Sequence, residues 1–377
     1  MKRICFVCPT TIMKRSIAAI IKKLKNMDVS LILPKVLAKE VDNSVHYSIV
    51  KNAKTKSFNV ILPHVLLSQF SIPINPLFFI KILKKNDIIH MWVPFYISNS
   101  LLALFKRLFF PNKKIILTMD TIPGYSFRLN RILDIFFRGY YKTIGRIVFG
   151  SVDLITLYGK SMLKYARMAG VPLNKICITP TGIDSELKIK DNDIRKEFDI
   201  SKDDRIILYI GYVNPRKGID TIIEIVNLLK FNDEKIKCII VGDGPNRKNY
   251  EKQVKKKKLN DKIIFTGFRK DVHNFYIEAD LFLFPSRGEG LAGVIMESMI
   301  YGVPIIASKI PGNMDLIKDK ENGFLCEMEN PKDYKDKIIT LLKDSNLQKK
   351  FINKSREIIK DKFSWDKNIK EFLKLYK

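Results

Sequence analysis

Short apolar runs alternate with longer amphipathic segments along nearly the whole chain. An amphipathic helix must bury its apolar face against another element, and an apolar strand beside it offers that surface. The runs are RICFVC, VSLILP, DIIHMWV, KKIILTMD and DLITLY in the first half, and RIILYIG, KCIIVGDG, KIIFTG, LFLFPS and VPIIAS in the second. The alternation predicts an α/β fold of parallel strands covered by helices.

The chain has 377 residues, which exceeds the usual size of a single hydrophobic core. Two successive Rossmann-like domains are the simplest account of the repeated pattern. Pro180 and Gly182 interrupt the pattern just before a polar, charged stretch, so we expect the domain boundary there. This divides the chain into an N-terminal domain (residues 1–182), a C-terminal domain (residues 183–360) and a C-terminal helix (residues 361–377).

Several features predict a cytoplasmic protein. The five cysteines are odd in number and scattered along the chain, which is typical of buried thiols in a reducing compartment. The first residues, MKRICFVCP, do not follow the order of a signal peptide because Pro9 interrupts them. The most apolar window, residues 88–105, contains polar residues and a proline that make it a poor membrane-spanning helix.

The formal charge of +28 is concentrated in the first half of the chain. Residues 1–180 contain 28 of the 67 Lys and Arg residues but only 7 of the 39 Asp and Glu residues, which leaves 39 basic and 32 acidic residues to the remainder. Such an excess of positive charge predicts an anionic partner: a membrane surface, a phosphorylated acceptor or nucleic acid. A generally lysine-rich composition is the alternative, but it does not explain the asymmetry.

Four polar, glycine-containing loops follow apolar runs in the second half. They are residues 211–220 (GYVNPRKGID), 241–245 (VGDGP), 265–272 (FTGFRKDV) and 285–308 (PSRGEGLAGVIMESMIYGVPIIAS). Any one of them alone is more often just a turn. Ligands of open α/β sheets bind at the carboxyl ends of the strands, so the four together predict one binding site.

The last of these loops contains two glutamates, Glu289 and Glu297, on either side of a predicted helix start. The amide groups at a helix start are unpaired and the local dipole is positive, so a diphosphate can bind there without a metal. In a continuous helix the two glutamates lie roughly 12 Å apart, beyond the ~5–9.5 Å that separates the carboxylates of glycosidases. The spacing favours a clamp on the two ends of an elongated ligand; solvated surface glutamates are the alternative.

These motifs resemble the retaining glycosyltransferases of family 4, strongly over residues 204–328 and loosely before them. The resemblance implies the GT-B fold, in which two Rossmann-like domains face each other across a cleft and a C-terminal helix crosses back to the N-terminal domain. It also implies that the C-terminal domain binds a nucleotide sugar and the N-terminal domain an acceptor. The predicted C-terminal helix, which begins with FSW, resembles the helix that crosses back in that family.

The resemblance assigns roles to residues of the second half. Lys217 with Arg216 is expected to bind the donor diphosphate, Glu289 to contact the donor sugar and Glu297 to contact the ribose. The backbone around Phe268 and Arg269 is expected to hold the base. The remaining predicted donor-binding residues are Gly211, Gly290, Leu291, Ala292, Gly293 and Val294.

The match departs from the family at two places in the donor half. The family often has an arginine where Tyr212 stands, so Arg216 is expected to supply the second positive charge. The family also usually reads E-G-F-G-L, whereas this chain reads E-G-L-A-G from Glu289 to Gly293. The phosphate-binding loop is therefore expected to differ in detail.

The acceptor half also departs from the family pattern. Its first loop, CPTTIMKRS, has no paired glycines, and Thr10 and Thr11 are its acceptor-side candidates. Asp120 takes the place of a family histidine and is assigned to the catalytic group; capping of the turn before Pro123 is the alternative. His90 ends an apolar run, and either faces the cleft or packs in the core.

Residues 129–147 are the candidate membrane contact. Four basic residues, Arg131, Arg138, Lys142 and Arg146, fall within roughly 80° of one another on a helix of ~100° per residue. Apolar and aromatic residues lie beside them, as in helices that bind membrane surfaces: Ile132, Phe136, Phe137, Tyr140 and Tyr141. A helix packed on its own sheet is the alternative.

The resulting hypothesis is a retaining hexosyltransferase that uses a UDP- or GDP-linked sugar and an acceptor hydroxyl, such as that of a lipid-linked or cell-surface glycan precursor. No Asp-x-Asp pair follows a strand, so we expect no metal, and we expect no cofactor besides the donor substrate. We place the protein peripherally on the inner face of the cell membrane. The alternatives are a sugar-nucleotide epimerase of the same fold, or a basic nucleic-acid- or membrane-binding protein; no motif predicts specific nucleic-acid binding.

Overall fold

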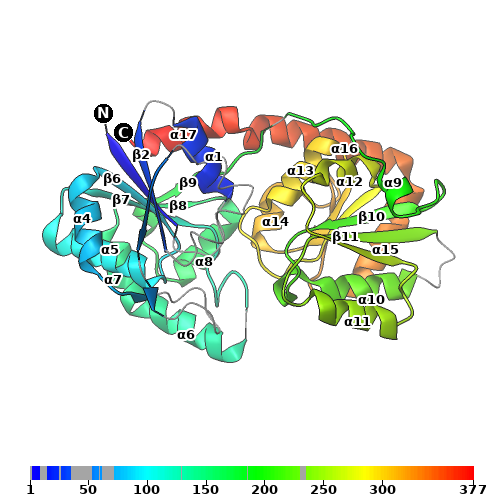
Figure 1. The fold of residues 1–377 in the computed structure, drawn as a ribbon, viewed down its shortest axis with the longest axis horizontal. Coiled ribbons are helices and arrows are strands. Elements are labelled where there is room, and N and C mark those ends of the chain that lie inside the picture. The colour runs from blue at the N-terminus through cyan, green and yellow to red at the C-terminus, as the bar shows by residue number, and fades with distance from the viewer. Residues whose placement is uncertain are drawn as a thin grey trace. The chain divides into compact units, whose positions relative to one another are not determined.

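The computed structural model describes residues 2–8, 15–24, 27–34, 53–58, 60–61, 72–128, 130–184, 186–229 and 235–377. It divides into two compact units. The first unit contains Met1–Gly182 and Asp366–Lys377, and the second contains Ile183–Trp365. Each unit has a sheet with helices around it (Figure 1), which confirms the predicted α/β class.

The first unit is built on a parallel seven-stranded sheet of order β3-β2-β1-β6-β7-β8-β9. The strands are β1 (Arg3–Val7), β2 (Asp28–Pro34), β3 (Lys54–Phe58), β6 (Ile88–Trp92), β7 (Lys114–Met119), β8 (Leu154–Leu157) and β9 (Ile176–Ile178). A separate antiparallel pair consists of β4 (Val60–Ile61) and β5 (Ile72–Pro73). The central strands β1, β6 and β7 are almost wholly buried, as their apolar runs predict.

The second unit is built on a parallel six-stranded sheet of order β12-β11-β10-β13-β14-β15. Its strands are β10 (Arg205–Ile210), β11 (Ile236–Val241), β12 (Ile263–Gly267), β13 (Leu281–Phe284), β14 (Ile305–Ser308) and β15 (Phe324–Cys326). The sequence did not predict the edge strands β3, β9 and β15. β3 is largely polar, and the other two are only three residues long, so none of them contains a long apolar run.

Helices surround both sheets. Those of the first unit are α1 (Arg15–Lys23), α4 (Leu77–Lys85), α5 (Ile97–Phe109), α6 (Arg131–Lys142), α7 (Ile144–Ser151), η1 (Lys160–Met162), α8 (Leu163–Met168) and η2 (Leu173–Lys175). Those of the second are α9 (Ile194–Glu197), η3 (Pro215–Lys217), α10 (Ile219–Leu229), α11 (Arg247–Lys256), α12 (Val272–Glu278), α13 (Gly293–Tyr301), α14 (Pro311–Leu316), α15 (Pro331–Lys343), α16 (Ser345–Ile358) and η4 (Ile359–Phe363). Within the described part of the chain, no helix is both long and apolar enough to cross a membrane.

The last helix, α17 (Trp365–Leu375), packs on the sheet of the first unit. Phe372 and Tyr376 are buried there, and the Tyr376 hydroxyl lies 2.7 Å from Nδ1 of His90 on β6. The side-chain amide of Asn368 donates to the Thr181 carbonyl at 3.0 Å. The C-terminus therefore belongs to the core of the unit that contains the N-terminus.

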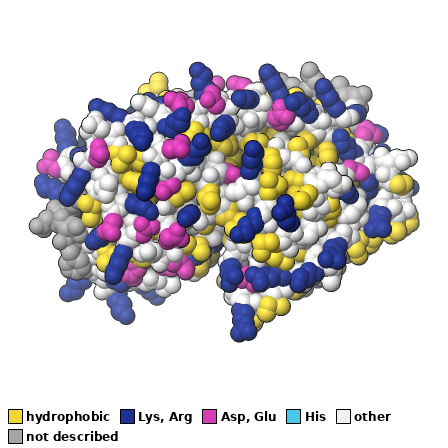
Figure 2. Space-filling model, turned by 180° about the vertical axis from the view of Figure 1, so that it is seen from behind, with side chains coloured by type: hydrophobic (Ala, Val, Ile, Leu, Met, Phe, Trp, Pro, Cys, Tyr) yellow, Lys and Arg dark blue, Asp and Glu magenta, His cyan; other side chains and the backbone are white. Residues whose placement is uncertain are grey.

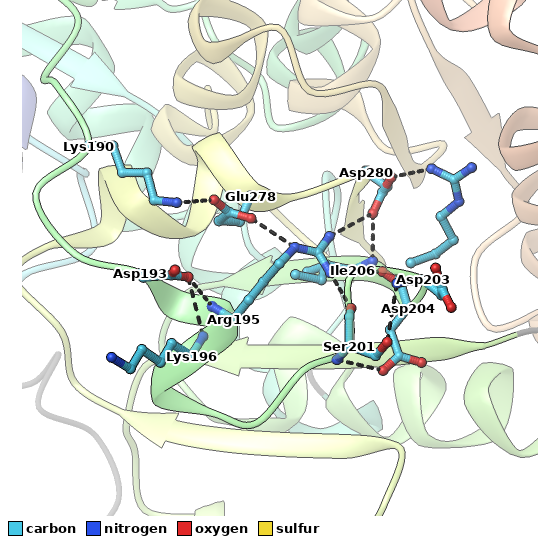
Figure 3. A network of polar contacts seen from close by, with 11 residues as sticks. Lys190, Asp193, Arg195, Lys196, Ser201, Asp203, Asp204, Ile206, Glu278 and Asp280 are labelled. Atoms are coloured by element: carbon cyan, nitrogen blue, oxygen red, sulfur yellow. Dashed lines mark hydrogen bonds and ion pairs between the residues drawn. The ribbon is translucent and has the colours of Figure 1, made fainter.

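A polar network holds the first segment of the second unit against the amino ends of its strands (Figure 3). Arg195 on α9 donates to Glu278 at 2.9 Å and lies 3.8 Å from Asp280, which directly precedes β13. Asp280 also accepts from Arg205 at 2.8 Å and from the Ile206 amide at 2.8 Å. The network lies at the amino ends of the strands, whereas the predicted ligand-binding loops follow their carboxyl ends.

Candidate functional site

Strand order brings two of the predicted loops together. β10 lies between β11 and β13, so the chain leaves β10 toward one side of the sheet and returns through β13 on the other. Such a switch point opens a crevice at the carboxyl ends of the two strands. The loop containing η3 follows β10 and the loop at residues 285–292 follows β13, so both lie at this point.

An ion pair joins these two loops across 72 residues of sequence. Lys217 Nζ donates to Glu289 Oε1 at 2.7 Å, and both side chains are nearly buried. The Ser286 hydroxyl donates to the same carboxylate oxygen at 2.5 Å. Lys217 also lies over the Phe284 ring, 5.3 Å from its centre. The predicted phosphate-binding lysine and sugar-binding glutamate therefore form one cluster.

Burial and charge act in opposite directions on these two groups. Burial alone would raise the pKa of Glu289, but the charges of Lys217 and Arg216, with hydrogen bonds from Lys217 and Ser286, lower it below its ordinary value. Burial lowers the pKa of Lys217, although the charge of Glu289 opposes this. The charge of each partner therefore favours the charged form of the other and opposes the effect of burial.

The backbones of the two loops are also joined. The Arg216 guanidinium donates to the Gly288 carbonyl at 2.6 Å. In return, the Arg216 carbonyl accepts from the Arg287 amide at 2.8 Å and lies 3.3 Å from the Ser286 hydroxyl. Arg216, predicted to bind phosphate, therefore also fixes the position of the loop that contains Glu289.

Arg287, which the sequence did not single out, forms further contacts between these two loops. Its guanidinium donates to both carboxylate oxygens of Asp220 on α10, at 3.0 and 2.6 Å, and to Glu329 at 2.6 Å. It also donates to the Pro215 carbonyl at the start of η3. A bidentate Arg–carboxylate pair fixes orientation as well as distance, so Arg287 sets the position of η3 relative to residues 285–289.

The predicted helix start is present, with Ala292 at the N-cap of α13 and Gly293 as its first residue. Alanine has no side-chain oxygen to accept hydrogen bonds from the first amides, so these amides can serve a ligand. The neighbouring α14 approaches the loop closely: a Cβ on Gly312 would lie 1.5 Å from the Gly290 carbonyl oxygen. Gly312 is therefore required for the position of the glycine loop, a contact that sequence spacing does not reveal.

Glu297 lies on α13 beside a second residue that the sequence did not predict. The Tyr276 hydroxyl is 3.0 Å from Glu297 Oε2 and 3.0 Å from the Val294 carbonyl. Tyr276 comes from α12, and its ring stacks on that of Tyr301. The hydroxyl orients the carboxylate predicted to contact the ribose.

The third predicted loop follows β12. Phe268 is 64% exposed, whereas the Arg269 guanidinium is paired with Glu197 and Asp271 and is oriented by both. These hydrogen bonds raise the pKa of Arg269 above its ordinary value. Gly211, at the end of β10, donates its amide to the Val241 carbonyl at 3.0 Å. The Arg269 side chain is thus engaged within the protein, and the predicted contact with the base falls to the backbone.

In the first unit, His90 occupies the packed position that was its alternative. It is fully buried, stacked on Trp92 with ring centres 4.0 Å apart. Its two nitrogens lie 2.7 Å from the hydroxyls of Tyr376 and Thr118. Burial lowers the pKa of His90 to about 3. Both ring nitrogens are used inside the unit, so His90 has none left for a ligand.

Asp120 directly follows β7, at the carboxyl end of the sheet. Its charge contributes to the raised pKa of Tyr96, Tyr141 and Tyr158, although burial is the larger cause for each. The following turn is closed by Ser126, whose hydroxyl accepts from the Ile122 amide at 2.8 Å. The other acceptor-side candidates, Thr10 and Thr11, lie outside the described residues.

The candidate membrane segment is divided at Thr143 into α6 and α7. Phe137 and Tyr141 pack inside the unit, while Tyr140 donates to the Pro94 carbonyl at 2.6 Å. Arg138 differs from the prediction, because its guanidinium donates to the Gly124 carbonyl at 2.8 Å instead of pointing to solvent with the other basic residues.

Comparisons with known proteins show what the chain is similar to as a whole. Residues 190–358 match the family model described as Glycosyl transferases group 1. The chain is 28% identical over 367 residues to an uncharacterized glycosyltransferase of Methanocaldococcus jannaschii, covering 93% of this chain and 90% of that protein. It is 30% identical over 302 residues to the O-antigen biosynthesis glycosyltransferase WclY of Escherichia coli, covering 78% and 80%.

Solved structures show the same architecture. The crystal structure of Anabaena HepE in complex with UDP and glucose matches with a TM-score of 0.80 at 16% identity, covering 100% of this chain and 99% of that chain. At this identity the likeness concerns the fold. It agrees with the two α/β units described above.

Proposed function

This chain belongs to the group 1 glycosyltransferases and has their GT-B fold, and on that premise we propose that it transfers a hexosyl group from a UDP- or GDP-linked sugar to an acceptor hydroxyl with retention of configuration. The resemblance to family 4 supports retention. The UDP bound to Anabaena HepE supports a nucleoside diphosphate donor.

The observation that carries the proposal is the buried pair of Lys217 and Glu289 at the switch point of the second sheet. One side chain is a cation suited to a diphosphate and the other a carboxylate suited to sugar hydroxyls. Arg216 and the start of α13 add further positive character at the same edge. An elongated anionic ligand with a sugar at one end fits this distribution of charge.

During transfer, the bond between the anomeric carbon and the diphosphate oxygen breaks, a bond to the acceptor oxygen forms, and the proton of the acceptor hydroxyl leaves with the departing diphosphate. Negative charge accumulates on the departing diphosphate, where Lys217, Arg216 and the first amides of α13 stabilise it. These groups are positioned before reaction, so little reorganisation is needed when the charge develops. Glu289 orients the sugar, and Glu297, held by Tyr276, binds the ribose.

We propose that this charge stabilisation needs no metal ion. Lys217, Arg216 and a helix start can together neutralise a leaving diphosphate, as at other phosphate sites built from helix N-termini. Transfer is therefore expected to continue at an undiminished rate in the presence of EDTA. A rate that falls with EDTA and returns with added Mg²⁺ or Mn²⁺ would show a metal requirement.

For the acceptor, we propose a lipid-linked or cell-surface glycan precursor at the cytoplasmic face of the membrane. The strongly basic first half of the chain supports an anionic surface as the working location. Asp120, at the end of β7, is the candidate to orient the acceptor hydroxyl.

A panel of UDP- and GDP-sugars tests the donor site, with thermal shift as the binding readout and slow donor hydrolysis as the chemical one. Glu289→Gln keeps the shape of the side chain but removes its charge, and we expect hydrolysis to fall about 10²–10³-fold. Glu224→Gln on α10 is the matched control, because Glu224 forms a surface ion pair with Lys257, and its loss should change the rate less than about twofold.

Hydrolysis by Glu289→Gln at the wild-type rate would contradict the site assignment. Release of nucleotide that speeds up on addition of an acceptor distinguishes a transferase from an epimerase, which needs no acceptor. The anomeric configuration of the product, read by NMR, tests retention.

A further inference from the structure

One face of α6 is exposed although it is mainly apolar. At ~100° per residue, its exposed residues form one arc about 140° wide, with Arg131 and Lys142 at one edge and the rest across it: Ile135, Gly139, Ile132 and Phe136. Ile132 is 80% exposed, Ile135 62% and Phe136 48%. Burying such side chains is strongly favourable, so their exposure together requires a reason.

The opposite face holds α6 in place, which makes the exposed face a stable feature of the fold. Phe137 and Tyr141 are fully buried, and the Tyr140 hydroxyl donates to the Pro94 carbonyl. Asn130 caps the helix by accepting from the Leu133 amide at 2.8 Å. The helix therefore does not need Ile132 or Phe136 for its own packing.

The apolar face continues beyond α6. α7 lies beside α6, and α5 lies beside α7 (Figure 1). Ile144 and Ile147 are exposed on α7, and Leu108 and Phe109 at the end of α5. We call the exposed residues of α6 and α7 the α6–α7 face.

The charge of the α6–α7 face has a single sign. Its exposed charged residues are Arg131, Lys142 and Arg146. Asp134 is the one acidic residue between positions 121 and 152, and it is buried. Figure 2 shows basic and hydrophobic side chains together at the lower edge of the view, where α6 lies in the first unit.

We propose that the α6–α7 face lies on an anionic phospholipid bilayer, with Ile132, Ile135 and Phe136 entering the headgroup boundary and Arg131 and Lys142 contacting lipid phosphates. The proposal rests on the membrane location proposed above and names the surface responsible. An exposed amphipathic helix with basic residues beside apolar ones binds anionic membranes in this way. Nucleic acid would satisfy the charges but leave the isoleucines in water.

Vesicle flotation of the full chain tests the surface. Vesicles of phosphatidylcholine with phosphatidylglycerol should float the wild-type protein, and vesicles of phosphatidylcholine alone should float much less. High salt should weaken the binding, since exposed charges are screened. Two variants test the two kinds of contact: Ile132→Ser with Phe136→Ser, and Arg131→Glu with Lys142→Glu. We expect each to lower the partition coefficient by at least about tenfold.

Matched controls lie in the second unit. Leu187→Ser with Ile189→Ser removes two exposed apolar side chains, and Lys255→Glu with Lys256→Glu on α11 changes the net charge by the same amount as the α6 pair. Both controls should float like the wild type. Thermal unfolding and stabilisation by UDP check that each variant is folded.

Three results would overturn the proposal. Equal losses in the α6 and α11 charge variants would mean that only the overall charge matters. Unchanged flotation of Ile132→Ser with Phe136→Ser would mean that the apolar face does not enter the bilayer. A wild-type dimer that dissociates in this variant, without lipid, would make the face a protein interface. Donor hydrolysis is measured separately, so failure of the lipid contact is distinguishable from failure of the proposed transferase activity.

Discussion

The two sheets of this protein use buried polar residues in opposite ways. In the second unit, the loops after β10 and β13 bring together charged side chains, Lys217 and Glu289, nearly buried. In the first unit, the interior between β6, β7 and β8 contains a neutral chain of hydrogen bonds. There His90 lies 2.7 Å from Thr118, which lies 2.6 Å from Thr156.

The difference separates two purposes of a buried polar group. The neutral chain in the first unit joins strands to the C-terminal helix through Tyr376, and all of its hydrogen bonds are satisfied within the protein. The charged pair in the second unit lies after the carboxyl ends of β10 and β13. At this position a bound ligand can take over part of the contacts that each ion makes with the other. Among the described residues of the first unit, exposed basic side chains lie on helices such as α4, α6 and α8.

The largest effect is expected from removing one ion of the charged pair. Lys217→Met leaves Glu289 buried without its cation, which should lower the free energy of unfolding by about 3–5 kcal/mol and the transfer rate by about 10²–10³-fold. Lys217→Met with Glu289→Gln should recover much of the stability but none of the activity. Chemical denaturation and turnover assays measure the two. Equal stability of the single and double variants would contradict a buried ion pair.

Substitution of Arg287 tests whether the contacts that join the two loops also position the pair of Lys217 and Glu289. Arg287→Ala removes the bonds to Asp220, Glu329 and the Pro215 carbonyl. We expect kcat/KM for transfer to fall about 10–100-fold, because small displacements of reacting groups are costly. Arg287→Lys keeps the charge but loses the bidentate geometry and should be intermediate. Steady-state kinetics decide this; a variant with normal kinetics and only a lower Tm would make Arg287 purely structural.

His90 makes the neutral network sensitive to acid. Its folded pKa of about 3 lies below the ordinary 6.5, so the unfolded chain binds a proton between these values while the folded unit does not. Stability should therefore fall as the pH decreases from about 6.5 toward 3, by at most about 1.4 kcal/mol per pH unit from this group.

Urea unfolding followed at a series of pH values measures this slope. His90→Gln should be less stable at pH 7 because it loses hydrogen bonds, but its stability should depend less on pH below about 6.5. An identical pH slope in the variant would mean that other groups cause the acid sensitivity.

The smallest effect is expected from Tyr276→Phe, which removes one hydroxyl beside Glu297. A single hydrogen bond contributes about 0.5–1.5 kcal/mol, so the Kd for UDP should rise about two- to tenfold with little change in kcat. Tyr301→Phe is the control, because its hydroxyl accepts from the Lys188 amide instead. Calorimetric titration with UDP compares the two variants. Equal affinities would show that the Tyr276 hydroxyl does not contribute to UDP binding.

Much of the fold was predictable from local pattern. Buried central strands need continuous apolar runs, so β1, β6, β7, β10 and β11 were evident in the sequence. Of the four edge strands, only β12 was evident, as the run KIIFTG; β3, β9 and β15 were not, because a strand that pairs on one side tolerates polar residues or spans only three positions. The apolar residues of α6 were assigned as one group, but only the structure separates exposed Ile132 from buried Phe137.

Part of the candidate site was also predictable. The order of polar loops singled out the segments that contain Lys217, Arg216 and Glu289, and the resemblance to family 4 assigned these residues their expected roles. The small residues before Val294 predicted a helix start. Arg287 and Ser286 lay in the same quoted segment, yet nothing in their spacing distinguished them from other loop residues. Tyr276 was missed because it lies 21 residues before Glu297, on a different helix.

The sequence by itself determined where the buried central strands run, where they end and which half of the chain is basic. These are properties of residues close in sequence, set by the periodicity of strand and helix. The tertiary structure decided that Lys217 meets Glu289, that Arg287 braces both loops, and that His90 is enclosed by the C-terminal helix. Such contacts depend on strand order, which places β13 beside β10, and no local pattern specifies that order.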